Sequence, residues 1–165
     1  MKLGKNDKLL KFFLDLSKSK QKEFLIKIIE KKPELQKTIL NKIKTKGIPV
    51  SAFNSKLSGL EVICWFLKYE KKFTAKKISE ILNRSENTIN STLRKARKKF
   101  KGKLDLSSGI IIPLYIFSDR KFAILESLVA YLINTYEMKI SQISELIGKK
   151  PATIKTVWYR WQNKH

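Results

Sequence analysis

An internal repeat limits what this chain can fold into more than any other feature of its sequence. When Leu60 is placed on Leu125, the sequence aligns with itself without a gap over Leu60–Lys99, and Ile-Ser-Glu at 78–80 falls on Ile-Ser-Glu at 143–145. Two copies of one sequence in register predict two copies of one supersecondary unit. We therefore expect two units with the same fold, the first repeat (residues 48–101) and the second repeat (residues 112–165).

The segments that flank this alignment predict how the two units are joined. When the offset between the two copies is reduced by one residue, Ile48-Pro49 falls on Ile112-Pro113. The residue before a proline avoids the helical region, so each unit should begin with extended backbone. Phe53 is expected to anchor the first of these segments on its own unit. Residues 102–111 include two glycines and two serines and predict a linker.

Within the first repeat, Thr74–Phe100 has the pattern of two short helices joined by a tight turn. Thr74 and Ser85 are suited to cap the two helices, and Asn83 tolerates the left-handed backbone that ends a helix. The second helix places its apolar residues on one face, namely Ile89, Leu93, Ala96 and Phe100. Any amphipathic hairpin has such a stripe, but two copies in register favour a helix-turn-helix with a DNA-recognition helix.

The polar face of each second helix holds the candidate DNA-binding residues. In the first repeat these are Asn87, Asn90, Ser91, Arg94, Lys95, Lys98 and Lys99, with Lys76 and Lys77 on the preceding helix. In the second repeat they are Lys155, Thr156, Tyr159 and Arg160.

The second repeat allows two interpretations. Its last helix has Trp158 and Trp161 on the apolar face, so it is suited either to DNA or to contact with another protein. A linker of about ten residues reaches at most ~33–36 Å. That reach is close to the spacing of neighbouring major-groove half-sites, so both repeats can contact one duplex.

Residues 57–100 resemble the fourth conserved region of bacterial sigma factors and the related regulator helix-turn-helix domains. The matching motifs are Leu-x-x-Leu-Glu, Thr-x-x-x-Ile-Ser-Glu-Ile-Leu, Ser-x-x-Thr-Ile and Arg-Lys-Ala-Arg-Lys-Lys. The resemblance covers most of each repeat and implies binding of promoter DNA in the major groove, often with contact to RNA polymerase. Ile-Pro-x-x-x-Phe before each repeat is not part of that pattern, and residues 1–47 lack the family's promoter-melting regions.

The charge of the chain favours a polyanionic partner. Lys and Arg number 36 against 14 acidic residues, a formal net charge of +22. The first repeat with its linker is more basic than the second, at net +9 against +4. Lysine supplies 31 of the 36 cations, and an AT-rich genome would produce the same drift toward lysine. The charge therefore supports a polyanionic partner but does not decide the function by itself.

Residue types for catalysis or metal binding are scarce. The chain has one cysteine, Cys64, on the apolar side of an expected helix, and its single histidine is the last residue. We expect no catalytic site, metal or cofactor, because no phosphate loop or nucleophile motif stands out. The longest apolar run, Ile110–Phe117, contains Pro113 and is too short to cross a bilayer. The expected location is the cytoplasm, in association with the nucleoid.

Residues 1–47 predict a separate helical segment. We expect a first helix over Asp7–Leu16, a second capped by Ser19, and a third that begins near Pro33 and ends at Gly47. Three helices of this length bury little apolar surface alone. The segment is expected to dock on the repeats, or to serve as a dimerisation face or partner site.

The sequence thus predicts an all-α protein that binds double-stranded DNA. The leading hypothesis is a transcriptional regulator, because Arg94 and Asn87 can make bidentate contacts to bases. The first alternative is an architectural chromatin protein with little sequence preference, which the excess of lysine favours. The second is an assembly adaptor for viral packaging or RNA polymerase. A homodimer is compatible with each of them.

Overall fold

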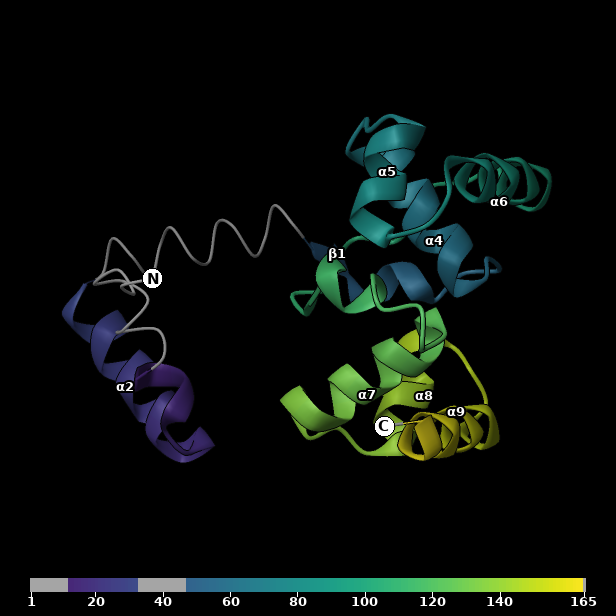
Figure 1. The fold of residues 1–165 in the computed structure, drawn as a ribbon. Helices are drawn as coiled ribbons and strands as arrows, with labels where there is room; N and C mark the ends of the chain where they lie inside the picture. Colours follow the sequence, from purple (N-terminus) through teal and green to yellow (C-terminus); the bar gives the residue numbers. More distant parts are fainter. Residues whose placement is uncertain (1–11, 33–46, 165) are drawn as a thin grey trace. The chain divides into compact units, whose positions relative to one another are not determined.

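The structure, a computed structural model, describes residues 12–32 and 47–164 and divides the chain into two compact units, Met1–Ile43 and Lys44–His165 (Figure 1). Helices predominate in the described residues, where strand is limited to two short segments. The expected all-α class is confirmed. Within these residues, no helix is both long enough and apolar enough to cross a membrane.

The described part of the first unit is a helical turn at residues 12–15 followed by α2, Lys18–Lys31. The cap is Ser17 rather than Ser19, because the Lys20 amide donates to the Ser17 hydroxyl at 3.5 Å. Phe13 and Phe24 pack with ring centroids 5.9 Å apart. The third expected helix, and the start of the first, lie outside the described residues.

The second unit repeats one order of elements twice. The first copy comprises β1 (Gly47–Pro49), η1 (Val50–Phe53), α4 (Gly59–Trp65), η2 (Phe66–Glu70), α5 (Ala75–Leu82) and α6 (Glu86–Lys99). The second comprises β2 (Ile111–Pro113), η3 (Leu114–Phe117), α7 (Ile124–Tyr136), α8 (Ile140–Ile147) and α9 (Pro151–Lys164). Helices α8 and α9 begin and end at the positions that the alignment pairs with the bounds of α5 and α6.

Local sequence signals place the helix ends as expected. The Thr74 hydroxyl accepts from the Lys77 amide at 3.2 Å and the Ser85 hydroxyl accepts from the Thr88 amide at 3.2 Å, so both residues are N-caps. Between these helices Asn83 has φ 50°. The same left-handed position in the second repeat is Gly148, with φ 61°. Both turns therefore have the conformation that their residues favour.

The two copies differ in their first helix. In the first repeat it is a short α-helix, α4, that continues as the π-helical turn η2. In the second repeat α7 is regular throughout its length. Shortly after η2 and directly after α7, the chain passes through equivalent non-glycine residues with positive φ, Lys72 at 58° and Glu137 at 53°. The chain direction after each helix is thus the same despite the irregular turn in the first.

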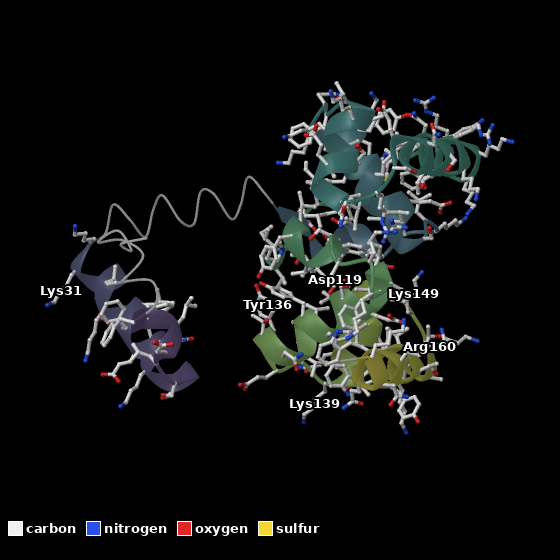
Figure 2. The ribbon with its side chains drawn as sticks, viewed as in Figure 1. Lys31, Asp119, Tyr136, Lys139, Lys149 and Arg160 are labelled. Carbon is white, nitrogen blue, oxygen red and sulfur yellow. The ribbon has the colours of Figure 1, made fainter. Side chains whose placement is uncertain are left out.

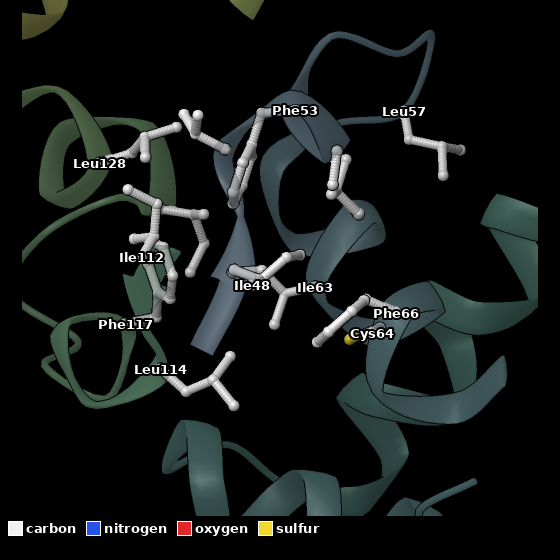
Figure 3. Close-up of a cluster of buried hydrophobic side chains, with 14 of the residues drawn as sticks. Ile48, Phe53, Leu57, Ile63, Cys64, Phe66, Ile112, Leu114, Phe117 and Leu128 are labelled. Atoms are coloured by element: carbon white, nitrogen blue, oxygen red, sulfur yellow. The ribbon is translucent and has the colours of Figure 1, made fainter. Parts of the chain in front are cut away.

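The two repeats share one hydrophobic core. Strands β1 and β2 pair antiparallel, and the Phe53 and Phe117 rings lie 6.0 Å apart between centroids. Figure 3 shows side chains of both repeats in one cluster, including Ile48, Ile63, Ile112 and Leu128. Phe53 therefore packs against its counterpart in the other repeat, and the expectation that it anchors only its own unit was incomplete.

The expected linker at 102–111 is fixed to this core. Leu104 is buried, and the Ser51 hydroxyl donates to the Asp105 carbonyl at 2.9 Å and accepts from the Ser108 amide at 3.2 Å. The Val50 amide donates to the Ile110 carbonyl at 2.9 Å. The spacing of the repeats is therefore set by packing, and the reach of a free linker does not determine it.

Candidate nucleic-acid interface

Helix α6 buries one face and exposes the other. Ile89, Leu93 and Ala96 are buried, and Thr92 is buried with them. On the opposite face the predicted residues Asn87, Asn90, Arg94, Lys95 and Lys98 are exposed, while Ser91 is half-buried. Side chains with nitrogen tips project outward around α6 (Figure 2). A rigid helix thus presents amides and cations to solvent.

Three of these cations have no acidic partner. Arg94, Lys95 and Lys98 form no ion pair with any of the residues that the structure describes. On α5, Lys76 is exposed, and Lys77 pairs with Glu80 at 3.3 Å. A pair so exposed is worth little energetically, so Lys77 can exchange Glu80 for another anion. The structure therefore places five of the predicted residues on the exposed side of α6, namely Asn87, Asn90, Arg94, Lys95 and Lys98.

Lys99 differs from the other predicted residues of α6, because its side chain, although 53% exposed, forms an ion pair with a buried carboxylate. Its Nζ is 2.8 Å from Oε1 of Glu61, and the side chain of Glu61 is only 5% exposed. The other oxygen of Glu61 accepts from the Ser58 amide at 2.8 Å. Lys99 thus joins the C-terminal end of α6 to the N-terminal end of α4. Its assignment as a DNA contact stays a prediction, although its ammonium group already has a buried partner in the protein.

The second repeat contains the same ion pair. Lys164 lies 2.8 Å from Oε2 of Glu126, which also accepts from the Ala123 amide at 2.9 Å. Sequence reasoning missed both pairs. The signal was present in the alignment, because it places Glu61 on Glu126 and Lys99 on Lys164, so that both partners recur together.

These hydrogen bonds hold both carboxyl groups in the ionised form. Burial alone raises the pKa of Glu61, but hydrogen bonds from Lys99 and Ser58 outweigh burial, and the pKa falls below its ordinary value. Burial also raises the pKa of Glu126, but hydrogen bonds from Lys164 and the Ala123 amide outweigh burial, so this pKa lies below its ordinary value too. Because the folded pKa is depressed, each group stabilises the fold fully above its unfolded pKa. That contribution is lost as the pH falls through the folded pKa.

We expect Lys99→Ala to lower the free energy of unfolding by ~1–3 kcal/mol at pH 7, because the buried Glu61 carboxylate loses one of its donors. Lys98→Ala, one position earlier on the exposed face, should change it by less than ~0.5 kcal/mol. Urea denaturation of the two variants measures the difference. The cost of Lys99→Ala should shrink as the pH falls through the lowered pKa of Glu61, because Glu61 is then protonated in the parent as well. Equal costs for both variants at pH 7 would contradict the structural role of Lys99.

Helix α9 presents a less cationic surface than α6. Its predicted residues Lys155, Thr156, Tyr159 and Arg160 are all exposed, and Arg160 lies at the surface of the second repeat (Figure 2). The Thr156 hydroxyl donates to the Ala152 carbonyl of the same helix at 2.9 Å. In the alignment Tyr159 replaces Arg94. The two exposed faces are therefore chemically different.

The tryptophans of α9 are less buried than their place on the apolar stripe predicts. Ile154 and Val157 are buried, whereas Trp158 and Trp161 are half-buried and stack with centroids 5.1 Å apart. Trp161 also contacts the Phe122 ring at 5.9 Å. These rings form an aromatic cluster at the edge of the second repeat. The first repeat has its own cluster, in which Trp65 packs against Phe100 and Tyr69.

The single thiol is buried in the core. Cys64 is fully buried, and burial raises its pKa to about 12, so the reactive thiolate is scarce at neutral pH. In the described part of the chain, no group of three or more His, Cys, Asp or Glu side chains could hold a metal ion. The exposed faces of α6 and α9 are thus the surfaces with the most distinctive chemistry.

Comparison of this chain with protein-family models, curated proteins and solved structures finds no match. The resemblance to the fourth conserved region of sigma factors therefore stays a prediction.

Proposed function

We propose that this protein binds duplex DNA in a sequence-specific manner and acts as a transcriptional regulator. The observation that carries the proposal is the exposed face of α6, where Asn87, Asn90 and Arg94 lie beside lysines that form no ion pair with the described residues, on a helix whose other face is buried. The major groove of B-DNA admits one α-helix. In this proposal α5 and α6 form the helix-turn-helix, and α6 is its recognition helix.

The side chains on α6 divide into two chemical groups. Arginine can bind guanine through two hydrogen bonds and asparagine can bind adenine in the same way, so Arg94 and Asn87 are proposed to read bases. Lysine is a point charge suited to phosphate, so Lys76, Lys95 and Lys98 are proposed to bind the backbone. The first group supplies sequence preference and the second supplies affinity.

The second repeat is proposed to bind the same duplex through α9. Lys155 and Arg160 supply positive charge, and Tyr159 supplies a large amphipathic ring at the position of Arg94. This helix is expected to contribute less affinity than α6, because it has fewer cations. A footprint over two major-groove segments about one helical turn apart would support the proposal. Contact of α9 with RNA polymerase or another protein would leave a footprint of one segment.

An architectural DNA-coating role is the second candidate, and the dominance of lysine among the cations favours it. Selection of bound sites from random duplex DNA distinguishes the two. A single enriched motif supports the regulator. Saturable binding without enrichment supports the coating protein, because phosphate contacts carry no sequence information.

We expect binding to weaken steeply as salt rises. Each phosphate neutralised by a lysine or arginine lowers log affinity by ~0.9 per log unit of salt, through release of counterions. If Lys76, Lys95 and Lys98 each bind a phosphate, they contribute a slope of ~2.7 by themselves. Titration of a labelled duplex from low to above-physiological salt measures it. Affinity that hardly changes across that range would count against the proposed surface.

A further inference from the structure

Equivalent residues of the two repeats meet each other at the junction. In the strand pair Ile48 lies opposite Ile112, and the alignment makes these two residues copies of one position. The two neighbouring pairs are also copies of each other, because the alignment places Gly47 on Ile111 and Pro49 on Pro113, and the structure pairs Gly47 with Pro113 and Pro49 with Ile111. When a position lies opposite its own copy in an antiparallel pair, a two-fold axis passes between the two.

Two further self-contacts lie on the same axis. Phe53 packs on Phe117, its own copy. Gly59 approaches Ile124, its own copy, so closely that a Cβ on the glycine would lie 2.8 Å from Cγ2 of the isoleucine. A repeat generated by translation along the chain would bring different positions together. Contacts between copies at three points along the core indicate a local dyad.

The remaining contacts between the repeats are reciprocal, as a dyad requires. Segment η1 packs on α8, and its copy η3 packs on α5. A cleft of about 530 Å³ at this junction is lined by Arg84 and by its copy Lys149, together with the starts of α4 and α7. Lys149 also donates to the Ser55 carbonyl at 3.5 Å, which ties the turn of one repeat to the loop of the other.

The dyad also relates the two exposed helices. Helices α6 and α9 have equivalent bounds and lie on the same side of the unit, away from β1 (Figure 1). Duplex DNA has dyads of its own perpendicular to its axis, which is why two-fold symmetric proteins bind inverted half-sites. Here one chain supplies both helices in the inverted arrangement.

We infer that the target is one duplex site with two half-sites in inverted orientation, read by α6 and α9 about the dyad. This inference rests on the proposed function and adds the arrangement of the target. The half-sites differ in sequence, because Arg94 and Asn87 of α6 are replaced by Tyr159 and Ala152 of α9. Unlike the palindrome of a homodimer, such a site has a direction, and the protein binds it in one orientation.

Site-directed cleavage of bound DNA tests the arrangement. An iron–EDTA group is attached to one new cysteine in the full chain, in four separate variants. Glu86→Cys and Pro151→Cys mark the starts of α6 and α9, and Arg97→Cys and Gln162→Cys mark equivalent exposed positions near their ends. The buried Cys64 should not be labelled, and the labelled parent chain is the control. Each variant is used on the site selected from random DNA, after its footprint is shown to match that of the parent.

The order of the cleavage centres along the duplex is the result. A dyad predicts a mirror order, either end–start–start–end or start–end–end–start. The alternating order start–end–start–end would mean that the half-sites are direct repeats, and it would overturn the inference. Cleavage from the α6 probes alone would overturn it as well. In both cases the proposal that the first repeat binds DNA would stand. If selection enriches no site, the proposed regulator fails and the inference falls with it. The two failures are therefore distinguishable.

Discussion

Phe117→Ala is expected to destabilise both repeats together, by ~3–5 kcal/mol, although the residue belongs to the second. The Phe117 ring is fully buried and lies 6.0 Å from the Phe53 ring between centroids, in the core that both repeats share. The variant leaves a cavity at the junction, where neither repeat has a separate core that could absorb the loss. Peptide-resolved hydrogen exchange should show α4 and α7 losing protection by similar factors.

A matched control lies two positions earlier in the same segment. Tyr115 is 71% exposed, so Tyr115→Ala should alter exchange little in either repeat. If Phe117→Ala raises exchange in α7 and leaves α4 protected, the repeats are independent domains.

Because the core is shared, a chain cut after Gly109 is also expected to lose the fold of its first repeat. Such a fragment lacks β2, η3 and α7, which cover Ile48 and Phe53.

Most of the local structure could be predicted from the sequence, because it is decided by residues close together in the chain. The caps at Thr74 and Ser85, the left-handed turns at Asn83 and Gly148, and the buried stripe of α6 all follow from side-chain chemistry within one or two turns. Burial of Cys64 follows in the same way. These signals give the bounds of helices but not the partner of each buried face.

The shared core could not be predicted, because its contacts join residues far apart in the chain. Phe53 and Phe117 belong to different repeats, and strands as short as β1 and β2 give too short a pattern to indicate pairing. The Ser51 hydroxyl binds the backbone of Asp105 and Ser108, so a stretch with the composition of a flexible linker is held in place. The repeated Ile-Pro segments outside the helical pattern were the available signal of an interface.

The ion pair of Lys99 was missed although a local signal existed. At 100° per residue Lys99 lies about 20° from the buried Thr92 and about 100° from Lys98, so it belongs at the edge of the buried stripe, but it was grouped with the run of cations around it. Its partner Glu61 lies in a different helix, at the start of α4. A charge run near the end of a helix can thus contain one residue that holds the helix to its neighbour. Lys95 and Lys98 form no ion pair with the described residues and remain available to a ligand.

Arg94→Ala is expected to weaken binding to the preferred DNA site by ~1–3 kcal/mol, which is a factor of about 5 to 150. Arg94 is exposed at the centre of the proposed reading face and has no acidic partner among the described residues, so its guanidinium can bind a base edge with two hydrogen bonds. Loss of such a contact should also flatten the base preference at one position, as repeated site selection with the variant would show.

Lys98→Ala is the matched comparison, because Lys98 lies one helical turn further along the same face and forms no ion pair with the described residues. If Lys98 binds a phosphate, its removal should weaken preferred and random duplexes by the same factor and lower the salt slope by about 1. Lys99 is unsuitable for this comparison, since its loss also unpairs Glu61. Affinities of both variants for both DNAs, measured at two salt concentrations, give the answer. If Arg94→Ala weakens random DNA as much as the preferred site, Arg94 binds the backbone, and sequence preference must come from other residues or from the shape of the DNA.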